Sequence, residues 1–116
     1  CTDGLLGGKP HPRVFGAFPR VLGKYVREEK VMPLEEAIRK MTSRPAEVFK
    51  VKERGLLKPG YFADITIFNP DTIIDKGTYV EPRQYPEGIE YVFVNGTLAV
   101  KEGKPTDATS GKVLKL

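Results

Sequence analysis

The stretches GLLKPGYFADITIF (Gly55–Phe68) and YVFVNGTLAV (Tyr91–Val100) decide the fold of this chain. In the first, a Lys-Pro-Gly turn sequence precedes an apolar run at residues 63–68, which predicts a strand. In the second, Asn95-Gly96 separates two apolar runs. Because asparagine and glycine tolerate the positive φ angles of a type I′ turn, we expect a β-hairpin with one strand on each side of them.

The regions next to these strands carry weaker signals. Residues 70–90 contain three prolines and two glycines and predict a long, ordered excursion. Residues 112–116 predict a last short strand. The strand segments are nearly continuous apolar runs, as in strands buried on both faces, which implies a covering layer of structure that this sequence need not itself contain.

The residues before Gly55 carry helical patterns. The four glycines and three prolines of residues 3–19 predict an ordered loop rather than a helix. A helix is expected from Pro19 to about Glu29. A second begins at Pro33, and its apolar residues 34, 37, 38 and 41 lie on one face. A short third helix begins at Pro45, capped by Thr42 or Ser43. With helices first and strands second, the chain belongs to the α+β class.

Composition narrows the possible functions. No apolar run approaches the roughly 18 residues that span a bilayer, so no membrane helix is expected. A single cysteine makes no internal disulfide, and the cytoplasm is the expected location. The chain opens with Cys-Thr-Asp-Gly rather than methionine, which indicates that it begins within a longer protein.

The charge of the chain is uneven. Residues 1–60 hold thirteen Lys and Arg against seven Asp and Glu, within a formal net charge of +4. A basic half could bind an anion, an acidic partner or nucleic acid. However, the basic residues are scattered singly along helices and accompany no nucleic-acid-binding motif, so nucleic acid is not an expected partner.

Several motifs together resemble the amidohydrolase superfamily. They are Thr42-Ser43-Arg44-Pro45-Ala46, the Gly55–Phe68 stretch with its Gly60-Tyr61-Phe62-Ala63-Asp64 core, and Val92-Phe93-Val94-Asn95-Gly96. Within that superfamily, residues 10–13, 18–23 and 84–89 resemble the N-acyl-D-amino-acid deacylase branch, also called D-aminoacylases. The resemblance covers nearly all of the chain, and the order and spacing of the motifs make it specific.

The resemblance implies an incomplete metal-dependent hydrolase fold. In the family, a (β/α)8 barrel is joined to a small β-domain built from both chain termini. Residues 1–54 would then be the end of the barrel, with a catalytic loop and the following helices, and residues 55–116 the C-terminal part of the β-domain. The implied reaction is hydrolysis of the amide bond of N-acyl-D-amino acids. The zinc of this family is held by residues upstream of the matching region, so this chain alone is expected to bind none and to be inactive.

Two residues match candidate site positions of that family. Asp3 matches an aspartate after the last barrel strand, which shuttles a proton between a metal-bound water and the departing amine. Taken without the resemblance, Asp3-Gly4 is an ordinary turn. Arg13 matches a residue that holds the carboxylate of the substrate, a task suited to a guanidinium fork. The alternative for Arg13 is an arginine that only faces solvent.

Three other residues are given structural roles. His11 is the only histidine, and zinc needs about three protein ligands, so it is expected to shape the loop rather than bind metal. Cys1 lacks the partners of a nucleophile and is expected to pack at a strand end. Asp64 precedes a strand and is read as structural. Five aromatic residues are expected in the core: Tyr25, Phe49, Phe68, Tyr91 and Phe93.

Two other functions remain open from the sequence. The missing layer over the strands would also fit a non-catalytic module that docks onto a partner chain. A related amidohydrolase, of the dihydroorotase or hydantoinase type, shares the Gly55–Phe68 signature but accounts less well for residues 10–23.

Overall fold

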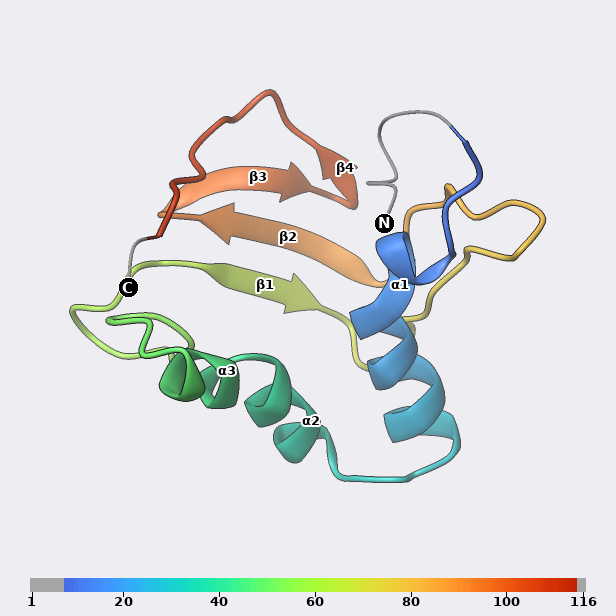
Figure 1. Ribbon diagram of the computed structural model, residues 1–116, viewed down its shortest axis with the longest axis horizontal. Helices are drawn as coiled ribbons and strands as arrows, with labels where there is room; N and C mark the ends of the chain where they lie inside the picture. Colours follow the sequence, from blue (N-terminus) through green and yellow to red (C-terminus); the bar gives the residue numbers. More distant parts are fainter. Residues whose placement is uncertain (1–7, 115–116) are drawn as a thin grey trace.

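Residues 13–48 form the helical part of the chain in the computed structural model, which describes residues 8–114 (Figure 1). Helix α1 (Arg13–Arg20) continues directly into the π-helix η1 (Val21–Glu28). Helices α2 (Leu34–Met41) and α3 (Ser43–Val48) follow and lie beside strand β1 in the view of Figure 1. No helix in residues 8–114 has the length and apolar character needed to cross a membrane.

The loop predicted for residues 3–19 is wrong from Arg13 onward, because α1 begins there. The residue before it, Pro12, already has a helical φ of −53°, and a proline is compatible with a helix start. Pro19 lies inside α1 rather than at the beginning of a new helix. It has no N–H to donate to the carbonyl of Phe15, and two residues later the helix widens into η1, where the Glu29 N–H bonds to the Lys24 carbonyl at 2.8 Å.

The other helices lie close to their predicted positions. The prediction for α2 is confirmed: it begins after Pro33, with Glu35 and Glu36 in its first turn. Helix α3 begins at Ser43, two residues earlier than predicted. The hydroxyl of Thr42 does not cap α3 but donates to the carbonyl of Ile38 at 2.7 Å.

The strands form one antiparallel sheet in the order β1-β2-β3-β4. Their bounds are Ile65–Phe68, Ile89–Val94, Thr97–Lys101 and Lys104–Pro105. The hairpin prediction is confirmed: β2 and β3 pair around Asn95 and Gly96, whose φ angles are 51° and 79°. The predicted strand at 112–116 is not formed by residues 112–114, and the last two residues lie outside the described part of the chain. The fourth strand is β4 instead.

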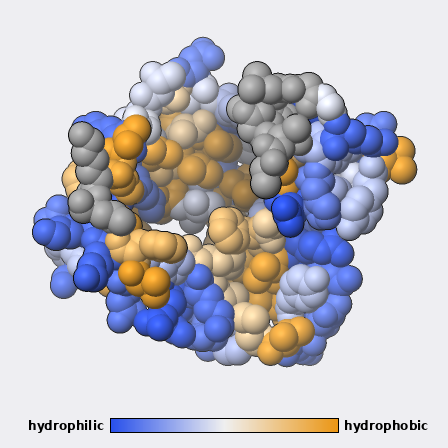
Figure 2. Space-filling view, viewed as in Figure 1, coloured by the Kyte–Doolittle hydropathy of each residue, from blue (hydrophilic) through white to orange (hydrophobic). Residues whose placement is uncertain are grey.

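The buried core lies between the helices and the start of the excursion. Among residues 8–114 the buried hydrophobic residues are Leu22, Ala37 and Ile73. The sheet itself remains partly open, and Ile67 in β1 is 43% exposed. Figure 2 shows hydrophobic residues gathered in the middle of the face in view and hydrophilic ones along most of its rim. Within the described residues, the expected burial of the strands on both faces is therefore not reached.

None of the five aromatic residues expected in the core is fully buried: Phe68, Tyr91 and Phe93 are half-buried, and Tyr25 and Phe49 are exposed. Phe49 is 62% exposed and Tyr25 is 37% exposed. Phe68, by contrast, packs against the buried cluster. Phe49 comes directly after the last residue of α3, where the helical spacing that predicted a buried face no longer applies.

A stripe of two glycines and two arginines joins α1 and η1 to residues 70–75. Gly16, Arg20, Gly23 and Arg27 recur at intervals of three or four residues, so they lie on one face of the helix. A methyl group on Gly23 would collide with the carbonyl oxygen of Ile73, and one on Gly16 would lie 2.5 Å from Cβ of Asp75. We call this face the glycine–arginine stripe.

The arginines of the stripe satisfy polar groups of the segment they face. The Arg27 guanidinium donates to the carbonyls of Ile73 and Pro70 at 2.6 and 3.2 Å. Arg20 pairs with the Asp75 carboxylate at 3.0 Å. Backbone carbonyls that make no ladder bonds are costly to bury, so the stripe lets an irregular segment pack tightly against a helix.

A second network ties the segment before β1 to the hairpin. Arg54 donates to the carboxylate of Asp64 and, at 2.6 Å, to Oδ1 of Asn95. Asp64 accepts the Asn95 backbone N–H at 2.8 Å, and the Asn95 amide donates to the Ser110 carbonyl at 2.7 Å. The Arg54 guanidinium also lies 4.2 Å from the ring centre of Phe62. These contacts give Asp64 the structural role expected of it.

Replacing Gly23 with alanine tests the stripe. Helix propensity alone favours alanine over glycine by about 1 kcal/mol, whereas the collision with the Ile73 carbonyl costs about 1–3 kcal/mol as overpacking. We expect Gly23→Ala to lower the free energy of unfolding, measured by urea denaturation followed by circular dichroism. A gain in stability would mean that the close approach to residues 73–74 does not occur.

Replacing Asn95 with glycine separates the contribution of the Arg54–Asn95–Ser110 hydrogen bonds to stability from that of the turn. Glycine accepts the same positive φ, so Asn95→Gly removes only the bonds to Arg54 and Ser110 and should cost about 1–3 kcal/mol. Glu102 has a φ of 50° in the turn between β3 and β4, and Glu102→Gly is the matched control. It should be neutral or slightly stabilising, because it relieves the left-handed strain of Glu102. Equal effects of the two changes in urea denaturation would contradict the role of the network.

Candidate functional site

A cleft of about 480 Å³ opens between the start of α1 and the first part of the 71–88 excursion. Both segments lie on the same side of the molecule in Figure 1. Two regions far apart in sequence supply its polar lining. Residues 11–25 contribute His11, Arg13, Arg20 and Tyr25, and the excursion contributes Asp75, Thr78 and Tyr79. It is the pocket that contains Arg13.

Arg13 is placed by the local structure at the first residue of α1. Its backbone N–H donates to Nδ1 of His11 at 3.1 Å, so the side chain two residues earlier satisfies one of the free donors of the helix N-terminus. The Arg13 side chain is exposed and lines the cleft. An exposed guanidinium beside an open cavity can form paired hydrogen bonds with a carboxylate.

Arg20 and Asp75 also line the cleft, but they pair with each other and so do not form a second anion site. The Asp75 side chain is 9% exposed and that of Arg20 is 46% exposed. Hydrogen bonding to Asp75, with a further contribution from Tyr25, raises the pKa of the Arg20 guanidinium above its usual value. The charge of Arg20 is thus compensated within the protein, which leaves Arg13 as the arginine in the cleft suited to an incoming anion.

The structure does not describe Asp3, which lies outside residues 8–114, and the same is true of Cys1. It therefore places Arg13 and His11 together, but gives no position for the predicted proton shuttle.

The described residues do not fit the zinc that the family resemblance implies. In residues 8–114 there is no cluster of three His, Cys, Asp or Glu side chains able to hold a metal ion, and zinc sites use about three protein ligands. His11 directs Nδ1 to the Arg13 N–H and Nε2 to the Tyr79 hydroxyl. Any metal used by the protein needs ligands beyond the described residues.

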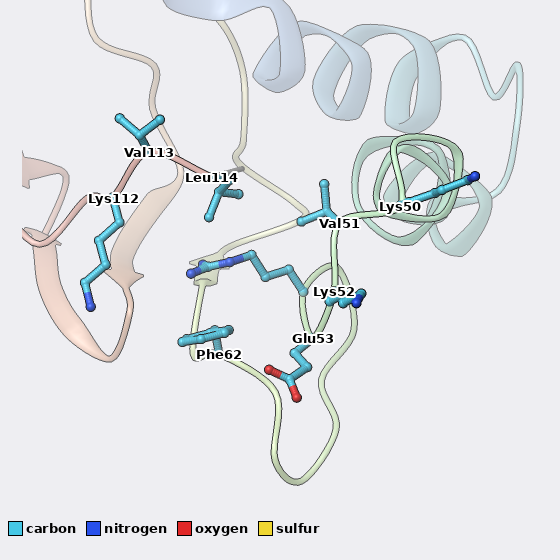
Figure 3. Close-up of a pocket in the computed structure, with 9 residues that line it drawn as sticks. Lys50, Val51, Lys52, Glu53, Phe62, Lys112, Val113 and Leu114 are labelled. Carbon is cyan, nitrogen blue, oxygen red and sulfur yellow. The ribbon is translucent and has the colours of Figure 1, made fainter. Parts of the chain in front are cut away.

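Another pocket, between residues 50–54, Phe62 and residues 112–114, is basic but not an anion site (Figure 3). Its lysines do not converge: Lys50 and Lys112 point in different directions, away from a common centre. The arginine of this pocket, Arg54, is already bound to Asp64 and Asn95. Separated ammonium groups in water bind an anion weakly.

Sequence reasoning missed Tyr79, Asp75 and Arg20 as cleft residues. The hydrogen bonds that bring them in join residues 55 and 68 positions apart, and no periodicity in the sequence records such pairings. The available signal was indirect: an excursion of this length without repeated structure usually packs on something or serves a function.

Comparison with known proteins gives the site its context. The amidohydrolase family model matches residues 7–100. N-acyl-D-glutamate deacylase of Alcaligenes xylosoxydans xylosoxydans is 43% identical over 115 residues, which is 98% of this chain but 23% of that protein. The chain thus spans about a quarter of the length of the curated relatives that it matches over nearly its whole length.

Solved structures agree in fold. A crystal structure of D-aminoacylase superposes with a TM-score of 0.91 at 42% identity, covering 93% of this chain and 23% of that one. N-acyl-D-glutamate deacylase of Bordetella bronchiseptica, solved with zinc and a phosphonate inhibitor, gives 0.78 at 45% identity, covering 89% and 23%.

Dihydroorotase of Lactobacillus gasseri matches a shorter part of the chain. It is 42% identical over 53 residues, or 46% of this chain and 12% of that protein. The deacylases, unlike the dihydroorotase, match almost every residue. The chain belongs to the amidohydrolase family, in which it is similar to D-aminoacylase and N-acyl-D-glutamate deacylase over nearly all of its length.

Proposed function

We propose that this chain is the C-terminal region of a metal-dependent amidohydrolase that hydrolyses the amide bond of N-acyl-D-amino acids. The observation that carries the proposal is the match, at 43% identity over 98% of the chain, to an N-acyl-D-glutamate deacylase. The fold supports it independently, through the TM-score of 0.91 with D-aminoacylase. The reducing cytoplasm remains the proposed location, on the argument from the single cysteine.

The proposed division of the chain follows its secondary structure. Residues 1–54 would be the end of a (β/α)8 barrel and residues 55–116 the C-terminal part of a small β-domain. In support, the described helices end at Val48 and the strands begin at Ile65. The excursion 71–88 belongs to the second region by sequence but packs on α1 and η1, so the two regions would share an interface next to the cleft.

Arg13 is the proposed anchor of the substrate carboxylate. Its position at the mouth of a cleft supports this, as does the pairing of Arg20 with Asp75, which leaves the Arg13 charge available. Asp3 is the proposed proton shuttle, solely on its match to the family position. The zinc of the family would be held by residues beyond those described here.

The partly open sheet favours a second candidate, a module that docks onto another chain. With Leu22, Ala37 and Ile73 as the buried hydrophobic residues among residues 8–114, the strands lack the cover that a stable sheet needs. The upstream part of the same protein, or a partner, would supply it. If light scattering showed that the chain alone is a stable, well-folded monomer, this would count against its dependence on either the upstream part or a partner.

The 116-residue chain alone should not turn over N-acyl-D-amino acids. We expect its rate with added zinc to equal that of zinc in buffer, because the described residues contain no cluster of metal ligands. The measurement is release of the free D-amino acid. Turnover well above the metal blank would refute the proposal that the chain lacks its metal site, and the relevant control is the same assay with a chelator.

In the complete enzyme that contains this region, Arg13→Ala should raise KM more than it lowers kcat. Loss of a charge-assisted hydrogen bond to the substrate costs about 1.5–3 kcal/mol, or roughly tenfold to a hundredfold in kcat/KM. Arg13→Lys should recover part of the loss, because a single ammonium replaces a fork. Steady-state kinetics on N-acyl-D-amino acids would show this, and an unchanged KM would remove Arg13 from the substrate site.

A further inference from the structure

The segment that carries Arg13 is held to the 71–88 excursion by a specific pair of side chains. Nε2 of His11 lies 3.3 Å from the hydroxyl of Tyr79, and the two rings meet edge to face, with centroids 5.2 Å apart at 84°. We propose that His11 and Tyr79 are positioning residues that fix the backbone of Arg13, and with it the direction in which Arg13 meets the substrate carboxylate. This inference rests on the proposed function.

The hydrogen bonds assign the role of both ring nitrogens of His11. Because the Arg13 N–H donates to Nδ1, that nitrogen must be unprotonated, and the proton of the neutral ring lies on Nε2. It then points to the Tyr79 hydroxyl, whose oxygen accepts it. The result is a chain of two hydrogen bonds that connects the Arg13 backbone through the imidazole to the excursion.

The contact to Arg13 has the form of an Asx turn. In that motif a side-chain acceptor at one residue receives the N–H two residues later. Here the imidazole takes the place of the asparagine oxygen, and it reaches further than asparagine would. The longer side chain is what allows the same residue to touch Tyr79 while holding Arg13.

Tyr79 is itself held in place, so it can act as a fixed point. Tyr79 lies within a turn that two bonds close, from Thr78 N–H to the Glu81 carbonyl at 3.0 Å and from Glu81 N–H to the Thr78 hydroxyl at 2.9 Å. Gly77 fits between Pro82 and Pro12, where a methyl group would lie 2.9 Å from the Pro82 carbonyl oxygen.

Two further contacts fix the ends of this arrangement. The Arg83 guanidinium donates to the carbonyl of Gly8 at 3.0 Å, which ties the far side of the excursion to the segment entering the cleft. On the near side, Arg20 holds Asp75. Between these two points the pair of His11 and Tyr79 spans the cleft wall beside Arg13.

The expected effect is on substrate binding. Ordering a backbone segment costs conformational entropy, so Arg13 binds an anion more tightly when its backbone is already fixed. Loosening that backbone weakens an interaction made in ground state and transition state alike, and this raises KM while kcat changes little. A hydrogen bond of ordinary strength corresponds to about a fivefold change.

Three variants of the complete enzyme dissect the pair. Tyr79→Phe keeps the ring and removes the hydroxyl. His11→Asn keeps an acceptor for the Arg13 N–H but withdraws from Tyr79, and His11→Ala removes both contacts. We expect KM to rise about fivefold in the first two and further in the third, with kcat within about twofold of the parent. The control is Tyr85→Phe: Tyr85 is also an exposed tyrosine of the excursion, at 66% against 76% for Tyr79, but does not line the cleft.

A double-mutant cycle decides whether the pair acts through Arg13. In an Arg13→Ala background, Tyr79→Phe and His11→Asn should raise KM no further, since their route to the substrate has gone. Full additivity, or parent-like KM in all three single variants while Arg13→Ala raises it, would overturn the inference and leave the proposed function intact. If Arg13→Ala itself leaves KM unchanged, the proposed role of Arg13 is what fails.

Nitrogen NMR gives a readout that does not depend on catalysis. The His11 signal is the one that disappears in His11→Asn, and its nitrogen shifts report the tautomer. For the neutral ring we expect the form with the proton on Nε2. A ring protonated mainly on Nδ1 would exclude the bond from the Arg13 N–H and would therefore overturn the proposed role of His11.

Discussion

The close approach of one helix to an irregular segment is the constraint on which the rest of the structure depends. Residues 70–75 run against α1 and η1 without a regular ladder of backbone bonds, and this is possible because Gly16 and Gly23 present no side chain there. The arginines of the glycine–arginine stripe then satisfy the carbonyls and the carboxylate that the approach would otherwise leave without partners. On one helix face, the glycines thus allow the close approach and the arginines that alternate with them provide the hydrogen-bond partners.

From that contact the two halves of the chain become coupled. The excursion leaves β1, crosses the helix, forms one wall of the cleft and returns to begin β2, with Ile74 and Glu87 bridging its two arms. At the other end of β1, Arg54 joins Asp64 to the hairpin turn at Asn95. Arginine contacts thus anchor the short β1 at both ends, in addition to the packing of Phe68 against the buried cluster.

The parts of this fold that sequence reasoning found are those fixed by local chemistry. Asn95 and Gly96 impose a turn wherever they occur between apolar runs, and Pro33 with its following apolar stripe imposes α2. The rule that proline begins a helix failed at Pro19, which lies inside a helix that changes to π geometry beyond it. His11 and Tyr79 were not paired from the sequence, since their contact depends on how the excursion crosses the helix. Arg13 could be singled out only by resemblance to a family, because an isolated arginine has no signature of its own.

The chemistry of the proposed enzyme explains why an anion clamp can be placed in this part of the fold. A metal centre requires several donors converging within about 2 Å of one point, which strands of a closed barrel can supply and which the described residues do not. A guanidinium at the end of a long side chain needs less: a fixed backbone, an uncompensated charge and access to a cleft. Arg13 meets these needs as far as residues 8–114 show: His11 accepts its backbone N–H, Asp75 is already paired with Arg20, and its place at the start of α1 lines the cleft. In the proposed enzyme, the excursion would hold the residue that binds the substrate carboxylate, so changes in the excursion would weaken substrate binding while kcat changes little.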